Sequence, residues 1–180
     1  MDIYLIRHGE AAARWSQSRD APLSEIGRKQ AQSVCGYFNE NRPMTIVSSP
    51  LLRAQETAVP LASFWGVEVE TDDSFRELPS LVSFEERVLW LKEIMQRTWD
   101  QVDGALMEWR EAAWRAVNSL DSDTVIFSHF MVINAILSMI IDSQRVVVFE
   151  PDYVSITRLI DRGNGIELFD LGKELDTTVL

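Results

Sequence analysis

The run Ile3-Tyr4-Leu5-Ile6-Arg7-His8-Gly9-Glu10 decides how the chain starts to fold. Four apolar residues in a row are typical of a short strand that is buried on both faces of a sheet. Arg7 and His8 follow at once, so they lie at the carboxyl end of that strand. We therefore expect a strand over residues 3–6 that delivers two basic side chains to the edge of the sheet.

Short apolar runs alternate with segments of helical period along the rest of the chain. Further strands are expected over residues 45–48, 67–71 and 124–128. Apolar side chains recur every three or four residues over 51–65 and 106–120, which predicts amphipathic helices there. This alternation predicts an α/β fold, a single-domain three-layer α/β/α sandwich over residues 1–171 with a mostly parallel sheet, followed by a polar tail over 172–180.

Serines mark the expected helix starts. Ser24 is expected to cap a helix that ends near Phe38, and Ser49 to cap one whose first turn holds Pro50. Ser83 with Glu86 three residues later predicts a capping box.

The last third of the chain is expected to form the edge of the sheet. Residues 146–149, 154–160 and 165–169 are rich in β-branched and aliphatic side chains and are separated by short turns. Connections this short force neighbouring strands to pair antiparallel.

Composition excludes several classes of partner. The 180 residues hold 17 Lys and Arg against 28 Asp and Glu, a net charge of −11. Such a chain lacks the basic surface that nucleic acid or an anionic membrane requires, so neither is expected as a partner. The most apolar stretch, residues 130–141, is shorter than the roughly 20 residues that span a bilayer and is expected to be a buried helix.

The cysteine content and the N-terminal residues indicate the cellular compartment of the protein. Cys35 is the only cysteine, which rules out an intrachain disulfide. Arg7 follows the first apolar run too early for a signal peptide. We therefore expect a cytoplasmic protein, while the oligomeric state stays open.

Polar residues gather at four of the expected strand ends. His8 follows the first strand and His129 follows the strand over 124–128. Arg53 lies one turn into the helix after residues 45–48, and Glu77 lies in the loop after residues 67–71. Ligand sites of open α/β sheets lie beyond the carboxyl ends of the strands, so these side chains are expected to meet.

Two histidines, two arginines and one carboxylate suit phosphoryl transfer without a metal ion or other cofactor. The planar forks of Arg7 and Arg53 match phosphate oxygens and stabilise charge in the transition state. A neutral His8 can attack phosphorus, and the two arginines disfavour its protonated form. Glu77, kept protonated, can donate a proton to the leaving alkoxide.

Several motifs, taken in order, resemble the histidine phosphatase (phosphoglycerate mutase-like) superfamily. They are Leu5–Glu10, Leu23–Ala31, Ser48–Ala58, Phe75–Leu78 and Ser128-His129. The resemblance implies that His8 is the phosphorylated nucleophile, that Arg7, Arg53 and His129 form the phosphate pocket, and that Glu77 is the proton donor. It implies a phosphatase that hydrolyses a phosphomonoester or a phosphohistidine through a phosphohistidine intermediate.

The chain also departs from the pattern of this superfamily. Arg14 stands where many members have Asn, Phe130 follows the second histidine in place of Gly, and residues 79–82 replace the Gly and Trp-Glu-Gly that commonly follow the acid. Arg14, with Trp15 and Arg19 beside it, is a candidate for substrate binding. The expected substrate is a small phosphorylated molecule, with a phosphoprotein as the other option.

Other functions fit some of the same residues. A phosphoryl mutase would use the same groups but pass the phosphate to another hydroxyl, and a non-catalytic domain would only bind a phosphorylated ligand. Two histidines and a carboxylate could also bind zinc, although the flanking arginines disfavour a cation. Glu85 and Glu86 are the alternatives to Glu77 as the acid.

Overall fold

A six-stranded sheet forms the centre of the protein in a computed structural model that describes residues 1–13, 17–40 and 42–175. The spatial order of the strands is β3-β2-β4-β1-β5-β6. Their bounds are Asp2–Arg7 for β1, Thr45–Ser48 for β2, Val69–Thr71 for β3, Thr124–Ser128 for β4, Ile156–Asp161 for β5 and Ile166–Asp170 for β6. The strands β3, β2, β4 and β1 are parallel, whereas β5 and β6 form an antiparallel edge. The predicted mixed sheet is confirmed.

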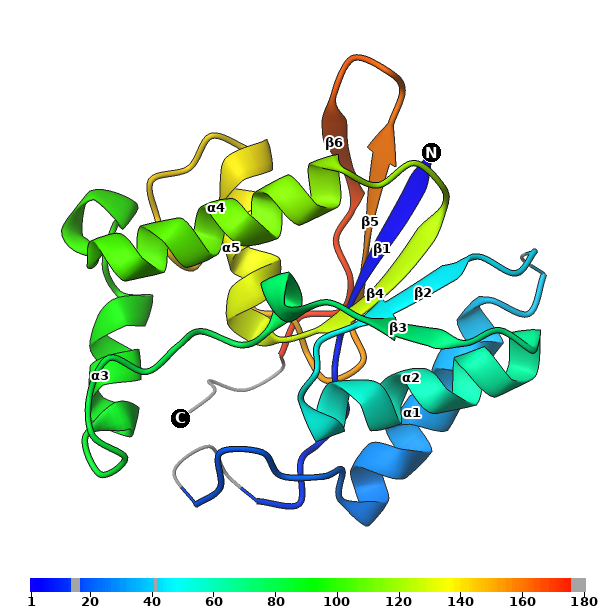
Figure 1. Cartoon of the computed structure of the whole chain (residues 1–180), viewed down its shortest axis with the longest axis horizontal. Coiled ribbons are helices and arrows are strands. Elements are labelled where there is room, and N and C mark those ends of the chain that lie inside the picture. Colours follow the sequence, from blue (N-terminus) through cyan, green and yellow to red (C-terminus); the bar gives the residue numbers. More distant parts are fainter. Residues whose placement is uncertain (14–16, 41, 176–180) are drawn as a thin grey trace.

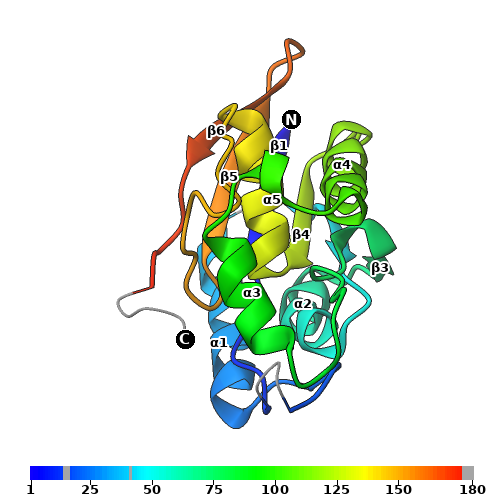
Figure 2. The ribbon, with the colours of Figure 1, turned by 90° about the vertical axis from the view of Figure 1, so that its left-hand side faces the viewer.

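Helices cover both faces of this sheet (Figure 1). The helices α1 (Glu25–Tyr37) and α2 (Leu52–Trp65) pack on one face, while α4 (Gly104–Asn118) and α5 (Phe130–Ile140) pack on the other. Figure 2 shows α3 (Arg87–Met95) in front of the strands, on the side of α4 and α5. Two 3₁₀ turns, η1 (Asp73–Phe75) and η2 (Trp99–Gln101), flank α3 in the sequence. The predicted three-layer sandwich is confirmed.

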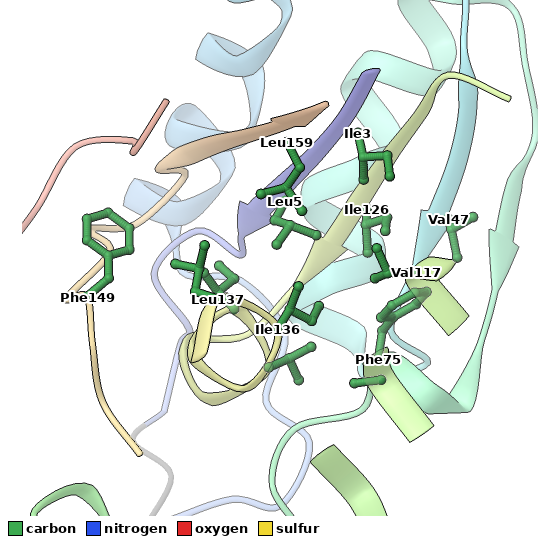
Figure 3. Close-up of a cluster of buried hydrophobic side chains, with 13 residues drawn as sticks. Ile3, Leu5, Val47, Phe75, Val117, Ile126, Ile136, Leu137, Phe149 and Leu159 are labelled. Atoms are coloured by element: carbon green, nitrogen blue, oxygen red, sulfur yellow. The ribbon is translucent and has the colours of Figure 1, made fainter. Parts of the chain in front are cut away.

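Strand β1 is buried on both faces, as its uninterrupted apolar run predicts. Ile3 and Leu5 pack with α4 and α5 in the cluster drawn in Figure 3. Tyr4 and Ile6 point to the opposite face, where they pack with α1 and α2. Burial on both faces fixes the register of β1, because a slip of one residue would exchange the two sets of side chains.

The predicted helix starts differ in outcome. Ser24 caps α1, since its hydroxyl accepts a hydrogen bond from the Gly27 N–H at 2.9 Å. The prediction for Ser49 is wrong, because α2 begins at Leu52 and residue 51 takes the capping position. Ser83 does meet Glu86, because its hydroxyl donates to the Glu86 carboxylate at 2.7 Å. The helix α3 begins at Arg87, however, so Glu86 and not Ser83 takes the capping position.

The prediction of a strand over residues 146–149 is also wrong. This segment joins no ladder of the sheet, because the N–H groups of Val148 and Phe149 donate to the side-chain oxygen of Asn134 at 2.8 and 2.9 Å. A buried amide on α5 thus replaces a neighbouring strand as the hydrogen-bond partner. Farther on, β5 begins only at Ile156, because Val154 adopts a left-handed backbone with φ of 54°.

The start of the predicted tail lies against the loop that precedes β5. Leu175 donates its N–H to the Glu150 carbonyl at 2.9 Å, and Lys173 pairs with Asp152 at 3.0 Å. Residues 176–180 lie outside the described residues. No helix in the described part of the chain is long and apolar enough to cross a bilayer.

Candidate active site

Hydrogen bonds beyond the ends of the strands bring the two histidines together. The His8 N–H donates to the Ser128 carbonyl at 2.9 Å, and the Ser49 N–H donates to the Phe127 carbonyl at 2.9 Å. The three chain segments therefore stay side by side for one residue past β1, β2 and β4. The His8 and His129 rings lie edge to face with their centroids 5.2 Å apart. The predicted meeting of these two residues is confirmed.

The hydrogen bonds of the His8 ring define which nitrogen carries the proton. Arg53 Nε donates to His8 Nε2 at 3.1 Å, and a guanidinium has no acceptor to offer in return. Nε2 must therefore hold a lone pair, so the proton lies on Nδ1, which donates to the Gly9 carbonyl at 2.7 Å. Burial, helped by the positive charges of Arg53 and Arg7, lowers the pKa of His8 well below its ordinary value. The lowered pKa favours a neutral imidazole, in which Nε2 is unprotonated and its lone pair accepts the hydrogen bond from Arg53.

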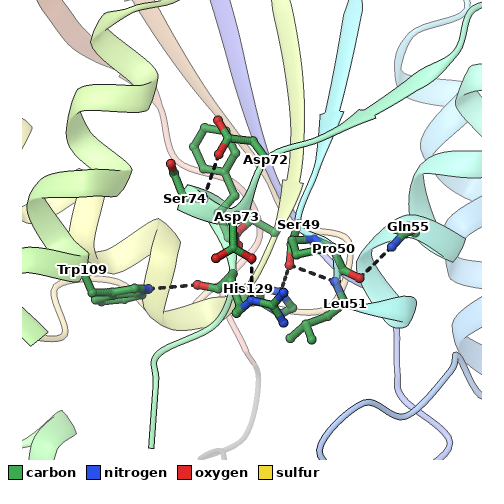
Figure 4. A network of polar contacts seen from close by, with 12 residues as sticks. Ser49, Pro50, Leu51, Gln55, Asp72, Asp73, Ser74, Trp109 and His129 are labelled. Carbon is green, nitrogen blue, oxygen red and sulfur yellow. Dashed lines mark hydrogen bonds and ion pairs between the residues drawn. The ribbon is translucent and has the colours of Figure 1, made fainter. Parts of the chain in front are cut away.

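His129 is fully buried, and Ser49 binds one side of its ring. Its Nε2 lies 2.8 Å from Ser49 Oγ, and that oxygen already accepts a hydrogen bond from the Leu51 N–H at 3.3 Å (Figure 4). The serine hydroxyl can then donate its own proton to Nε2. His129 Nδ1 has no hydrogen-bond partner in the described structure. In this tautomer Nδ1 carries a proton for which the described structure offers no acceptor.

Two aromatic rings hold the Arg7 guanidinium. Its central carbon lies 4.3 Å from the centroid of the Tyr153 ring and 5.5 Å from that of Phe130. Arg7 Nη1 also donates to the Pro151 carbonyl at 2.8 Å. A planar cation that contacts two rings and a carbonyl loses side-chain freedom, which favours a fixed phosphate fork.

Sequence reasoning missed Tyr153, because only the folded chain brings the turn before β5 next to β1. The Val154 N–H donates to the Arg7 carbonyl at 3.0 Å, which fastens that turn to the end of β1. The replacement of Gly by Phe130 was noticed in the sequence, and the structure gives it a role against Arg7.

Arg53 reaches His8 because the first turn of α2 packs against the loop after β1. The Thr57 hydroxyl donates to the Arg53 carbonyl at 2.6 Å and accepts the Gly9 N–H at 3.0 Å. Gly9 itself packs on Gly27, where a Cβ on either residue would overlap backbone atoms. Arg53 is only 6% exposed, so it is part of the site and not a surface residue of α2.

Glu77 lies in the loop after η1, and this loop is tied to β4 and α4. Ser128 donates its hydroxyl to the Phe75 carbonyl at 2.9 Å, and the Trp109 indole donates to the Arg76 carbonyl at 2.9 Å (Figure 4). The Leu78 N–H donates to Glu77 Oε1 at 3.0 Å. Desolvation raises the pKa of Glu77, although Arg53, Arg7 and backbone N–H groups oppose this shift. Burial thus shifts this carboxyl group toward its protonated form.

The chemistry of these groups suits a phosphate. Two arginines, a buried imidazole donor and a histidine with an unprotonated nitrogen are the groups that bind and attack a phosphate, and Glu77 can serve as an acid. In residues 1–13, 17–40 and 42–175 no three side chains of His, Cys, Asp or Glu are grouped so as to hold a metal ion. Arg14 and Trp15 lie outside the described residues, so the structure does not place these predicted substrate contacts.

Comparison with known proteins identifies the family. The family model described as "Histidine phosphatase superfamily (branch 1)" matches residues 3–172. The chain belongs to the histidine phosphatase superfamily. A curated relative in Yersinia pestis, "Probable phosphoglycerate mutase GpmB", is 40% identical over 82 residues, which cover 43% of this chain and 38% of the relative. This histidine phosphatase superfamily chain thus matches well under half the length of that relative.

Solved structures share the fold of this superfamily member over most of its length. A phosphoserine phosphatase from Entamoeba histolytica, solved with 3-phosphoglyceric acid, has a TM-score of 0.74 at 22% identity and covers 96% of both chains. A mycobacterial glucosyl-3-phosphoglycerate phosphatase, solved with VO3, has a TM-score of 0.69 at 22% identity and covers 88% of this chain and 90% of its own. These likenesses show the common histidine phosphatase architecture.

Proposed function

We propose that the protein is a phosphatase that hydrolyses a small phosphomonoester through a phosphohistidine on His8. The single observation that carries this proposal is the donation from Arg53 Nε to His8 Nε2, which requires a lone pair on that nitrogen. A nucleophile must have such a lone pair, and the guanidinium of the same arginine can bind phosphate oxygens.

In the first step, the Nε2 lone pair attacks phosphorus and the bond from phosphorus to the ester oxygen breaks. Arg7, Arg53 and the free His129 Nδ1–H stabilise the negative charge on the remaining phosphate oxygens. The leaving alkoxide takes the proton of Glu77, whose pKa is raised by burial. The products are the free alcohol, phosphohistidine and a Glu77 carboxylate.

In the second step, water attacks the phosphorus of phosphohistidine. The Glu77 carboxylate accepts a proton from this water, and the bond between phosphorus and Nε2 breaks. The electron pair returns to His8, inorganic phosphate leaves, and Glu77 is again an acid. Each cycle therefore restores the proton and the lone pair with which it began.

A phosphatase transfers the phosphoryl group of phosphohistidine to water, whereas a mutase transfers it to a second hydroxyl. Between Glu77 and the start of β4 the chain holds only α3, η2 and α4. Mutases that resemble this family carry a longer insertion there, which shields phosphohistidine from water. A phosphatase is therefore favoured, with a small substrate in the pocket of about 380 Å³ beside Glu77.

The test is hydrolysis of an aryl phosphate by the wild-type protein and by His8→Asn, with and without a chelator. We expect the variant to lose at least about a thousandfold in rate, because the nucleophile is gone. Vanadate should inhibit the wild type, and the chelator should not. Circular dichroism checks that the variant folds, and Arg115→Ala on the exposed face of α4 serves as the control. A His8→Asn variant that hydrolyses at the wild-type rate would refute the proposal, and loss of activity with the chelator would favour the zinc alternative.

A further inference from the structure

Val154 has a backbone conformation that β-branched residues avoid. Its φ of 54° lies in the left-handed region, where the Cβ of an L-residue comes too close to the following carbonyl oxygen. In the part of the chain that the structure describes, the only other non-glycine residue with a positive φ is Asp142, and Asp tolerates this conformation better. Such strain persists only where the surrounding contacts impose it, and it is frequent beside active sites. The contacts around Val154 therefore indicate what the strained backbone does.

The turn over residues 151–155, here called the Arg7 turn, makes three hydrogen bonds with Arg7. The Val154 N–H donates to the Arg7 carbonyl at 3.0 Å, and the Arg7 N–H donates to the Ser155 carbonyl at 3.2 Å. Arg7 Nη1 donates to the Pro151 carbonyl at 2.8 Å. The turn thus binds both the backbone and the side chain of the arginine that precedes the nucleophile.

The same turn brings the Tyr153 ring to the active site. The ring centroid lies 4.3 Å from the central carbon of the Arg7 guanidinium and 6.1 Å from the centroid of the His8 ring. Because Val154 follows Tyr153 directly, the left-handed backbone of Val154 determines where the chain goes after this ring. The strain at Val154 is therefore linked to the placement of an aromatic ring on Arg7.

The contacts of the Arg7 guanidinium leave one of its edges for a ligand. Nη1 is bonded to the Pro151 carbonyl, whereas Nε is buried and has no hydrogen-bond partner among the described residues. A buried donor without an acceptor is costly. Nε and Nη2 together form a planar fork that matches two oxygens of a phosphate. The Arg7 turn thus occupies one end of the guanidinium and leaves the Nε–Nη2 edge.

Asp152 and the C-terminal segment hold the Arg7 turn from its other side. Asp152 Oδ1 accepts the Tyr153 N–H at 2.8 Å, and the Asp152 carbonyl accepts the Ser155 N–H at 3.1 Å. The Asp152 N–H donates to the Lys173 carbonyl at 2.9 Å, and Oδ2 pairs with Lys173 Nζ at 3.0 Å. Gly172 lies so close that a Cβ would overlap the Ser155 hydroxyl. The strained turn is therefore fixed on both sides.

We infer that Tyr153, held by the left-handed turn at Val154, is a positioning residue that fixes Arg7 so that its Nε–Nη2 edge meets the phosphate. The inference rests on the proposed function and adds a positioning residue to the same site. Tyr153 acts through Arg7 and touches neither the leaving group nor the attacked phosphorus. Its ring, and not its hydroxyl, is the part that matters, because the ring is what contacts the guanidinium.

The first experiment compares Tyr153→Leu with Tyr153→Phe in hydrolysis of 4-nitrophenyl phosphate and in inhibition by vanadate. Tyr153→Leu should lower kcat/KM by about tenfold or more and raise the inhibition constant of vanadate by a similar factor, because a desolvated cation–π contact is lost. Tyr153→Phe keeps the ring and should bring both values back to within about threefold of the wild type. Tyr37→Leu on α1, where the tyrosine is 49% exposed, is the matched control and should change neither value.

The second experiment tests whether Tyr153 acts through Arg7. Arg7→Met removes the fork but keeps an unbranched stem. In that background Tyr153→Leu should lower kcat/KM by no more than about twofold, since there is no guanidinium left to position. Thermal unfolding of each variant shows whether it folds.

Two variants of Val154 test the turn itself. Glycine adopts a φ of 54° without strain and keeps the N–H that bonds to Arg7, whereas proline has a φ fixed near −65° and no N–H. Val154→Pro should lower kcat/KM at least about fivefold more than Val154→Gly does. Equal values in two folded variants would refute the role of the left-handed turn.

The remaining outcomes separate this inference from the proposed function. If a folded Tyr153→Leu keeps the wild-type kcat/KM and vanadate inhibition, the positioning role is refuted while the phosphatase remains. A Tyr153→Phe protein as impaired as Tyr153→Leu would refute the role of the ring, and an equal loss with and without the Arg7 guanidinium would refute action through Arg7. If the wild type neither hydrolyses the ester nor binds vanadate, the proposed function fails, and this inference fails with it.

Discussion

Arg53 gives the sharpest quantitative prediction, because its replacement by Lys keeps the charge but removes the planar fork. Arg53 is 6% exposed and its Nε donates to His8 Nε2 at 3.1 Å. On phosphate binding we expect the fork to make two charge-assisted hydrogen bonds, each contributing about 1.5–3 kcal/mol. Lys retains about one of them. Arg53→Lys should therefore lower kcat/KM by roughly 10- to 150-fold, and Arg53→Ala by roughly 10²- to 10⁴-fold.

The assay is kcat/KM for 4-nitrophenyl phosphate, with thermal unfolding measured for each variant. Arg115→Lys, an exposed substitution of the same kind on α4, is the matched control and should leave kcat/KM unchanged. A folded Arg53→Lys protein within about threefold of the wild type would refute the reasoning, because such a loss is smaller than one charge-assisted hydrogen bond.

Other predictions follow from burial and packing. The pKa values of His8 and His129 are lowered by burial, so the unfolded chain binds more protons below about pH 6.5. As the pH drops below 6.5, the free energy of unfolding should then fall, with each of the two histidines contributing up to about 1.4 kcal/mol per pH unit. A free energy of unfolding that stays constant in urea titrations down to pH 5.5 would contradict this. The raised pKa of Glu77 predicts that hydrolysis of an alkyl phosphate slows as pH rises through that pKa, and that Glu77→Gln lacks this dependence; pH–rate profiles of both proteins are the check. Gly27→Ala should cost about 1–3 kcal/mol of stability in thermal unfolding, since its Cβ would overlap the Glu10 carbonyl, whereas Gly36→Ala on open helix surface should not destabilise.

The parts of the fold that depend on local pattern could be predicted from the sequence. The apolar run over residues 3–6 is buried on both faces, and the strand over 124–128 has the predicted bounds. Because parallel strands deliver their carboxyl ends to one edge, the positions of His8 and His129 followed from these two strands. Their ring contact confirms that step.

Features that depend on distant contacts could not be predicted in this way. Residues 146–149 have the composition of a strand, but Asn134 on α5 takes their N–H groups. Ser49 has the sequence context of a helix cap, yet its hydroxyl bonds to His129. Tyr153 reaches Arg7 only through the turn at Val154. In each case a polar or aromatic group finds a partner that is far away in the sequence, and local periodicity holds no information about such partners.

The central claim is that phosphate becomes covalently bound to His8, and a trapped phosphoenzyme tests it most directly. With an activated aryl phosphate, Glu77→Gln should still form phosphohistidine, since that leaving group needs no proton, but should hydrolyse it slowly. After rapid denaturation in base, mass spectrometry should find the phosphate on His8, stable in base and lost in acid. Phosphate on another residue, or no phosphoenzyme in a protein that turns over the substrate, would contradict the account.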